Sequence, residues 1–282
     1  MEEEESSMNF VMLADGRHIA YEEQGVEKRM AKRSLLVLHG ISSSCITGML
    51  GVSEDLLKEM GVRLVSIDRP GYSLSDFNQK QTYKSAAGDI AQIADALELG
   101  EKFWLLGYSG GGPYCWAAAR FIPECLAGIA MWAPVENYGW RDISKTERKV
   151  VMRQIKPVLS PPDVSNLNLQ VSRDLIERDS VESAKQKGKG MAQDWLLLTH
   201  DWGFELSEML QVYQGPLHIF HGELDWVVPL FFQQCITNWS LPDVMHLHIL
   251  NGEGHYSAFH FNDRTHCITL DSLFGNAELN TD

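Results

Sequence analysis

A single serine, Ser109, stands where the sequence is expected to turn from a strand directly into a helix. It is the middle residue of Gly-Tyr-Ser-Gly-Gly, which follows the apolar run 103–106 and leads into the alanine-rich stretch 114–120. A serine hydroxyl becomes a good nucleophile when a neighbouring base takes its proton, and glycines two residues to either side permit the sharp turn that exposes it. The pattern therefore predicts a nucleophile elbow with Ser109 as the reactive residue.

The base and the acid that such a serine needs are expected later in the chain, each in a loop after a strand. An apolar run at 216–220 leads into a loop that holds Asp225, before a new helix at Pro229. A second run at 244–250 is followed by a glycine-flanked turn that holds His255. We expect His255 to act as the base and Asp225 as the acid that orients it, with Glu223 as the competing acid.

A pair of backbone N–H groups is the remaining requirement, because they can hold the negatively charged oxygen that forms during attack. The apolar run 35–38 ends at His39 and Gly40, where a loop could aim the N–H of Ile41 at a substrate carbonyl. The second donor would be the N–H of Gly110, the residue after the serine. The sequence thus predicts an oxyanion hole formed by Ile41 and Gly110.

These segments together resemble the α/β-hydrolase superfamily, which includes esterases, lipases and carbon–carbon-bond hydrolases. The matching pieces are His39-Gly40, the segment Asp-Arg-Pro-Gly-Tyr-Ser-Leu-Ser-Asp at 68–76, the Ser109 elbow and the Asp225 and His255 loops, over about residues 9–135 and 215–272. Their occurrence in this order is far more specific than any one of them.

The resemblance implies that Ser109, Asp225 and His255 form a catalytic triad. It favours Asp225 over Glu223, because the acid of the family lies four residues before a proline that opens the next helix. It also implies that 68–76 is a structural turn in one wall of the pocket, without a catalytic role. It does not imply a substrate, because one fold serves many chemistries.

Hydrophobic periodicity predicts an α/β fold. Segments 9–13 and 18–22 alternate around Asp15-Gly16, which indicates a hairpin. Strands are expected at about 35–38, 63–67, 102–107 and 127–132, separated by helical stretches such as 84–98. This alternation predicts a mostly parallel central sheet with helices on both faces, the α/β-hydrolase fold.

The alternation stops between the sheet-forming parts. A capping box at Ser144 and Glu147 predicts a helix to about residue 156, prolines at 161 and 162 break the chain, and another helix is expected near 191–198. We interpret 136–214 as a helical cap inserted between two parts of the core, 1–135 and 215–282. Its aromatic residues Trp195, Trp202 and Phe204, with Met191, could line a pocket or pack the cap onto the core.

Composition excludes several classes of function. The chain has 282 residues and a net charge of −14, so the basic surface that binds nucleic acid or anionic membranes is not expected. No apolar stretch approaches the ~20 residues that span a bilayer. The first seven residues are acidic, unlike an export signal, and five cysteines lack paired spacing. We expect a cytoplasmic protein without membrane insertion.

Neither a cofactor nor a metal is expected. Glycines 110–112 lack the lysine and the Ser/Thr of a P-loop. His246 and His248 alternate on a strand, but no further ligand stands at a spacing typical of zinc sites.

The prediction is therefore a cofactor-independent serine hydrolase, most similar to a carboxylesterase, acting on a small or medium, largely apolar small-molecule substrate. Two alternatives stay open. The same triad could perform acyl transfer or carbon–carbon cleavage, or the fold could serve a small-molecule receptor. The sequence does not indicate the substrate or the oligomeric state.

Overall fold

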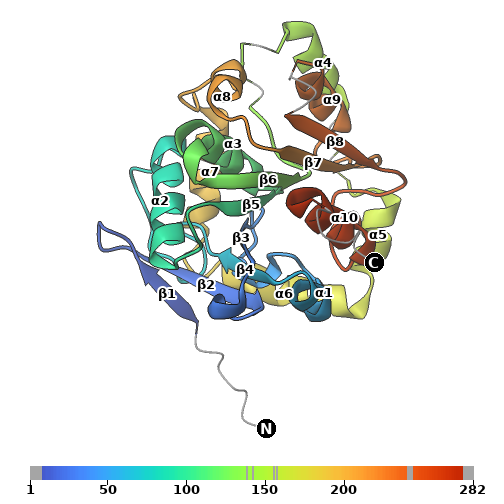
Figure 1. Cartoon of the computed structure of the whole chain (residues 1–282). Coiled ribbons are helices and arrows are strands. Elements are labelled where there is room, and N and C mark those ends of the chain that lie inside the picture. Colours follow the sequence, from blue (N-terminus) through green and yellow to red (C-terminus); the bar gives the residue numbers. More distant parts are fainter. Residues whose placement is uncertain are drawn as a thin grey trace, which may run out of the picture.

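One eight-stranded sheet forms the centre of the protein in the computed structural model, which describes residues 8–137, 139–141, 143–154, 156, 158–239 and 244–275 (Figure 1). The spatial order of the strands is β1-β2-β4-β3-β5-β6-β7-β8. Their bounds are β1 Asn9–Met12, β2 His18–Gly25, β3 Arg33–Leu38, β4 Val62–Ile67, β5 Phe103–Tyr108, β6 Leu126–Trp132, β7 Leu217–Gly222 and β8 Met245–Leu250. The acidic segment 1–7 considered above lies outside the described residues.

The hairpin β1–β2 is antiparallel, and β2 also pairs antiparallel with β4. Every other pairing, from β4 through β3 to β8, is parallel. Parallel strands are covered on both faces, and the fully apolar runs of β3 and β5 suit such burial. The predicted hairpin and mostly parallel sheet are confirmed.

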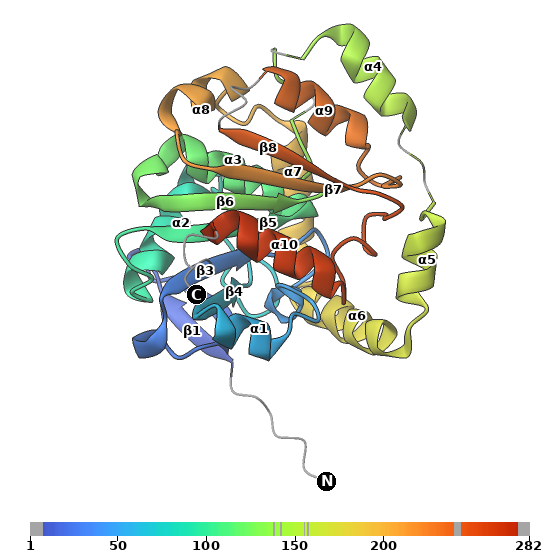
Figure 2. The ribbon, with the colours of Figure 1, turned by 45° about the vertical axis from the view of Figure 1, so that its right-hand side comes forward.

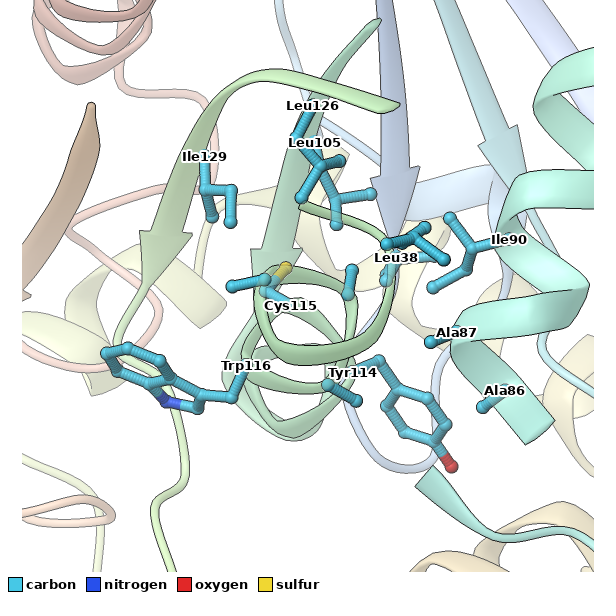
Figure 3. Packing of buried hydrophobic residues seen from close by; sticks show 14 of the residues in the cluster. Leu38, Ala86, Ala87, Ile90, Leu105, Tyr114, Cys115, Trp116, Leu126 and Ile129 are labelled. Atoms are coloured by element: carbon cyan, nitrogen blue, oxygen red, sulfur yellow. The ribbon is translucent and has the colours of Figure 1, made fainter. Parts of the chain in front are cut away.

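Successive residues of β3 belong to two different hydrophobic clusters, one on each face of the sheet. Leu36 and Leu38 pack with α2 (Tyr83–Ala96), α3 (Gly112–Phe121) and α9 (Leu230–Trp239). Leu35 and Val37 pack with α1 (Glu54–Glu59) and α10 (Asp263–Phe274). Figure 3 shows the first cluster, in which Cys115 of α3 faces the strands and Tyr114 points toward α2. Helices therefore cover both faces, as the sequence predicts.

In the described part of the chain, five helices lie between β6 and β7, and Figure 2 shows α4, α5 and α6 following one another along one side of the molecule. Their bounds are α4 Lys145–Gln154, α5 Pro161–Leu167, α6 Gln170–Ser183, α7 Lys189–Thr199 and α8 Leu206–Val212. The predicted capping box is confirmed, because Ser144 and Glu147 each accept from the other's backbone N–H at 3.2 and 2.8 Å. The division into a core, 1–135 and 215–282, and a cap, 136–214, stays a proposal.

The break expected at prolines 161 and 162 lies between two helices, because α4 ends at Gln154 and α5 begins at Pro161. Proline fits the first turn of a helix because the N–H groups there have no intrahelical partner. The longer helix α6 has no counterpart among the sequence predictions.

The aromatic residues of this helical region pack mainly onto the core. Trp202 and Phe204 are buried, and the Trp202 ring lies 4.7 Å from that of Tyr83 on α2. Trp195, by contrast, is 56% exposed. In the described part of the chain, no helix is both long and apolar enough to cross a membrane.

Candidate active site

Ser109 lies at the tight corner between β5 and α3. It is a non-glycine residue in the left-handed region, with φ of 49°, a conformation that is costly for an L-residue and is common at functional sites. The corner leaves no room for a side chain at Gly107 or at Gly111. A Cβ at Gly107 would lie 2.5 Å from Cys115 Sγ, and one at Gly111 would lie 2.4 Å from the carbonyl oxygen of Leu38. The two glycines of the elbow motif are therefore required by close approach.

The structure brings the three predicted side chains together. His255 Nε2 lies 3.0 Å from Ser109 Oγ, and its Nδ1 lies 2.7 Å from Asp225 Oδ2. The other oxygen of Asp225 accepts the backbone N–H groups of Val227 and Val228 at 2.9 and 2.8 Å. The acid is thus held in place by its own loop, and the imidazole bridges the acid and the serine.

Glu223, the competing acid, lies elsewhere. It is exposed, and its side chain accepts the backbone N–H of Gly252 at 3.0 Å.

The electrostatics of the pair favour a charged imidazole. Burial alone would lower the pKa of His255, but the adjacent Asp225 carboxylate raises this pKa above its usual value of 6.5. Burial would likewise raise the pKa of Asp225, but His255 holds it below its usual range. His221 lies 3.4 Å from Asp225, and its pKa is lowered by burial. It donates from Nε2 to the carbonyl oxygen of Val228 at 2.8 Å, so one ring proton lies on Nε2.

The loop after β3 orients the Ile41 N–H through the preceding carbonyl. The oxygen of Gly40 accepts from His39 Nδ1 at 2.7 Å and from Arg69 Nη2 at 3.0 Å. In a trans peptide unit the C=O and the next N–H point in opposite directions, so the Ile41 N–H points away from Arg69. Gly110 packs against Ile41, because a Cβ added at Gly110 would lie 3.0 Å from the backbone nitrogen of Ile41. The two predicted donors are therefore neighbours.

A cavity of about 190 Å³ opens beside Ser109 and His255. The Gly40–Ile41 loop forms part of its wall, and α6 supplies Ile176, Asp179 and Ser180 from one helix face. Ser43 and Thr47 add hydroxyl groups. The wall is therefore mixed in polarity.

The sequence of this chain matches one known protein family. Residues 33–260, most of the chain, match the family model described as alpha/beta hydrolase fold. The chain belongs to the alpha/beta hydrolase fold family. Membership supports a hydrolase as the class of activity. No curated protein is similar enough in sequence to match the chain.

Solved structures agree on the fold of this α/β-hydrolase. An alpha/beta hydrolase fold protein from Nakamurella multipartita is similar at TM-score 0.69 and 21% identity, covering 95% of this chain and 100% of that one. A thermophilic esterase from Thermogutta terrifontis is similar at TM-score 0.67 and 18% identity, covering 94% and 97%. The meta-cleavage product hydrolase CumD is similar at TM-score 0.68 and 19% identity, with the same two coverages. At these identities the likeness shows the fold.

In this α/β-hydrolase, a buried ion pair connects α7 to the Gly40–Ile41 loop. Arg69 Nη1 lies 2.6 and 2.7 Å from the two carboxylate oxygens of Asp194, and the hydroxyls of Tyr72 and Tyr114 donate to the same carboxylate. Arg69 therefore connects Asp194 on α7 with the carbonyl of Gly40. The resemblance implied a structural turn for the Arg69 segment and gave no role to Asp194, because no local pattern pairs two residues 125 positions apart.

A second carboxylate that the sequence analysis did not identify borders the cavity. Asp179 on α6 accepts the backbone N–H and the hydroxyl of Ser44 at 2.8 and 2.5 Å, and its other oxygen lies 3.4 Å from Thr47 Oγ1. Burial raises its pKa, an effect partly offset by the hydrogen bonds from Ser44.

The alternating histidines of β8, His246 and His248, both contact His218 of β7. His218 Nδ1 lies 3.0 Å from His248 Nε2, and the His218 ring stacks on His246. Burial, with the two neighbouring imidazoles, lowers the pKa of His218 to about 4. Within the described residues, no three His, Cys, Asp or Glu side chains gather in a way that could hold a metal ion.

Proposed function

We propose that the protein is a serine hydrolase that cleaves carboxylic esters with a Ser109–His255–Asp225 triad. The observation that carries the proposal is the continuous chain of contacts from Ser109 Oγ through both ring nitrogens of His255 to Asp225, at 3.0 and 2.7 Å. Both distances suit proton transfer and orientation of the imidazole.

The reaction follows from these positions. His255 Nε2 takes the hydroxyl proton as Ser109 Oγ attacks the ester carbonyl, and the N–H groups of Ile41 and Gly110 stabilise the oxyanion. The protonated imidazole then gives its proton to the leaving alcohol as the carbonyl–oxygen bond breaks. Water, deprotonated by His255, attacks the acyl-enzyme. The imidazolium returns this proton to Ser109 Oγ as the bond between Oγ and the acyl carbon breaks, and the carboxylic acid leaves. Asp225 holds the tautomer with the proton on Nδ1 and stabilises the imidazolium. No step requires a cofactor.

The cavity favours a small substrate. Its volume of about 190 Å³ is below the several hundred Å³ common for pockets that enclose drug-sized ligands. The expected preference for largely apolar substrates stays a prediction, and the hydroxyls of Ser43 and Thr47 add hydrogen-bonding capacity to the wall. We also propose a cytoplasmic location, in keeping with five free cysteines, and no nucleic-acid partner.

A carbon–carbon-bond hydrolase is the second candidate, because the structurally similar CumD is a meta-cleavage product hydrolase. The same nucleophile, base and oxyanion donors would serve it. Acyl transfer to an alcohol and a receptor without turnover are the remaining alternatives, and product analysis with and without an acceptor alcohol separates them.

The nucleophile is tested by covalent labelling. A fluorophosphonate probe should add once to wild-type protein, at Ser109, and not to Ser109→Ala, because only an activated serine reacts readily with such phosphorus centres. Ser165→Ala, which removes an exposed hydroxyl on α5, is the control and should label like wild type. An adduct at another residue, or equal labelling of Ser109→Ala, would contradict the assignment.

The substrate class is tested by a series of chromogenic esters from acetate to palmitate. We expect kcat/KM to be highest for short acyl chains, because the cavity is small. A preference for long chains with activation at a lipid surface would contradict the proposal, as would turnover of carbon–carbon substrates alone.

A further inference from the structure

Asp163, on helix α5 of the inserted region, contacts the turn that carries His255. It is fully buried and accepts three successive backbone N–H groups, from His255 at 3.0 Å, Tyr256 at 2.7 Å and Ser257 at 3.0 Å. The Ser160 hydroxyl donates to the same carboxylate at 2.7 Å. Both carboxylate oxygens are used.

The turn is shaped around this carboxylate. Convergent N–H groups of consecutive residues form a concave site for an anion, and hydrogen bonds to a charged acceptor are about twice as strong as neutral ones. A Cβ at Gly254 would lie 2.4 Å from each oxygen of Asp163, so only glycine allows the backbone to approach so closely. The fit between α5 and the turn is therefore close on both sides.

The backbone of His255 is held on its carbonyl side as well. The hydroxyl of Tyr108, the residue before the nucleophile, donates to the carbonyl oxygen of His255 at 3.1 Å. Asp225 orients the imidazole ring, whereas Asp163 and Tyr108 fix the peptide units from which the ring projects. The position of Nε2 relative to Ser109 depends on both sets of contacts.

We propose that Asp163 is a positioning residue that sets the His255 turn and makes the triad geometry depend on the docking of α5. This inference rests on the proposed function, because it assigns a role through His255. A displacement of about 1 Å at a catalytic group can reduce a rate about 100-fold. The inserted region would thus contribute to the competence of the base as well as to the wall of the cavity.

The first test is Asp163→Asn. The amide keeps the shape of the side chain but presents an NH₂ group to at least one of the three N–H donors, so the turn should lose hydrogen bonds. We expect kcat and the rate of fluorophosphonate labelling to fall roughly 10- to 100-fold with KM within about twofold of wild type. Amide hydrogen exchange at 255–257 should accelerate.

The pH profile provides a readout that a merely structural role would not move. The negative charge of Asp163 contributes to the raised pKa of His255, after the larger effects of burial and of Asp225. Asp163→Asn should therefore shift the acid limb of kcat/KM to lower pH. The other titratable groups that face His255 are unchanged by this substitution; they are Asp225, His221, Tyr108, Tyr256 and His260.

The matched control is Asp174→Asn, an exposed aspartate on α6 whose carboxylate contacts only Gln170 among the hydrogen bonds of the described residues. It should match wild type in kcat, in exchange at 255–257 and in pH profile.

A second variant keeps the inference testable if Asp163→Asn does not fold. Gly254→Ala places a methyl group against the carboxylate and should lower kcat and accelerate exchange in the same way. Its control is Gly88→Ala on α2, where an added Cβ meets no atom within 4 Å.

If Asp163→Asn and Gly254→Ala both kept the kcat of the wild type and its exchange rates at 255–257, the inference would be overturned. Labelling of the wild-type protein at Ser109 would still support the triad in that case. A lower melting temperature without faster exchange of the turn or a shifted pH profile would overturn it too. Failure of the proposed function is a separate outcome, recognised when wild-type protein is not labelled at Ser109.

Discussion

Asp225 Oδ2 lies 2.7 Å from His255 Nδ1, and the second oxygen of the same carboxylate is fixed by the N–H groups of Val227 and Val228. The contact leaves Nε2 of the imidazole facing Ser109. In the proposed triad, the acid is therefore pre-organised by its own loop, and no rearrangement is needed as the imidazolium forms.

The first prediction follows from this contact. Asp225→Asn should lower kcat by about 10³- to 10⁴-fold with little change in melting temperature, because the amide favours the wrong imidazole tautomer. Glu223→Gln is the matched control and should retain most activity, since Glu223 is exposed and contacts Gly252. Ester hydrolysis and thermal melts of both variants provide the measurement. If Glu223→Gln lost activity while Asp225→Asn stayed active, the acid of the triad would be Glu223 and not Asp225.

The second prediction concerns pH. The base must be neutral to accept the proton of Ser109, and Asp225 raises the pKa of His255 above 6.5 although burial opposes it. Wild-type kcat/KM should therefore rise with pH and reach half of its maximum above pH 6.5. The residual kcat/KM of Asp225→Asn should reach half of its maximum at a lower pH, because the negative charge that stabilises the His255 imidazolium is absent. A wild-type midpoint below 6.5, or an upward shift in the variant, would count against the pairing.

The third prediction concerns substrate charge. Asp179 borders the cavity beside Ser109 and should disfavour acyl groups that carry a carboxylate. Asp179→Asn should raise kcat/KM for an anionic ester such as a hemisuccinate about 5- to 10-fold relative to a butyrate ester, as expected for roughly 1 kcal/mol of charge repulsion. Glu177→Gln, an exposed acid on the same helix, is the control. If the ratio of kcat/KM between the two esters were unchanged in Asp179→Asn, the Asp179 carboxylate would not repel anionic substrates.

The fourth prediction separates stability from activity at the buried ion pair. Asp194→Leu leaves the Arg69 guanidinium buried without its partner and should lower the free energy of unfolding by about 3–5 kcal/mol, measured by denaturant titration. Adding Arg69→Met should restore part of this stability, because the unpaired charge is removed.

The double variant should nevertheless stay slow in ester hydrolysis. Without Arg69, the Gly40 carbonyl loses one of its two donors, and the Ile41 N–H loses orientation. Full recovery of kcat together with stability would show that Arg69 has no effect on the orientation of the Ile41 N–H.

Much of the fold could be predicted from local patterns. The strand β5, the elbow and α3 follow one another in the chain, so their apolar run, glycines and alanines specify them without reference to distant residues. The start of α4 is likewise local, because the two residues of the capping box are three positions apart.

The helix α6 shows where such patterns are insufficient. Val171 and Val181 are 49% and 67% exposed, so the helix lacks the continuous apolar stripe that indicates a packed helix. Asp179 instead joins it to Ser44 by hydrogen bonds, 135 positions away in sequence. Polar docking of this kind leaves no periodic signal.

The sequence by itself determined the strands of the sheet, helices such as α2 and α3, the elbow at Ser109 and the loops that carry Asp225 and His255, because each depends on residues within a few positions. Only the tertiary structure decided what surrounds them. Asp163, Asp179 and Asp194 each bond to a residue 92 to 135 positions away, and a hydrogen bond or ion pair across that distance is set by the packing of helices α5, α6 and α7 against the rest of the fold. The sequence does not distinguish an aspartate that faces solvent from one that, like Asp163, accepts the backbone N–H of His255.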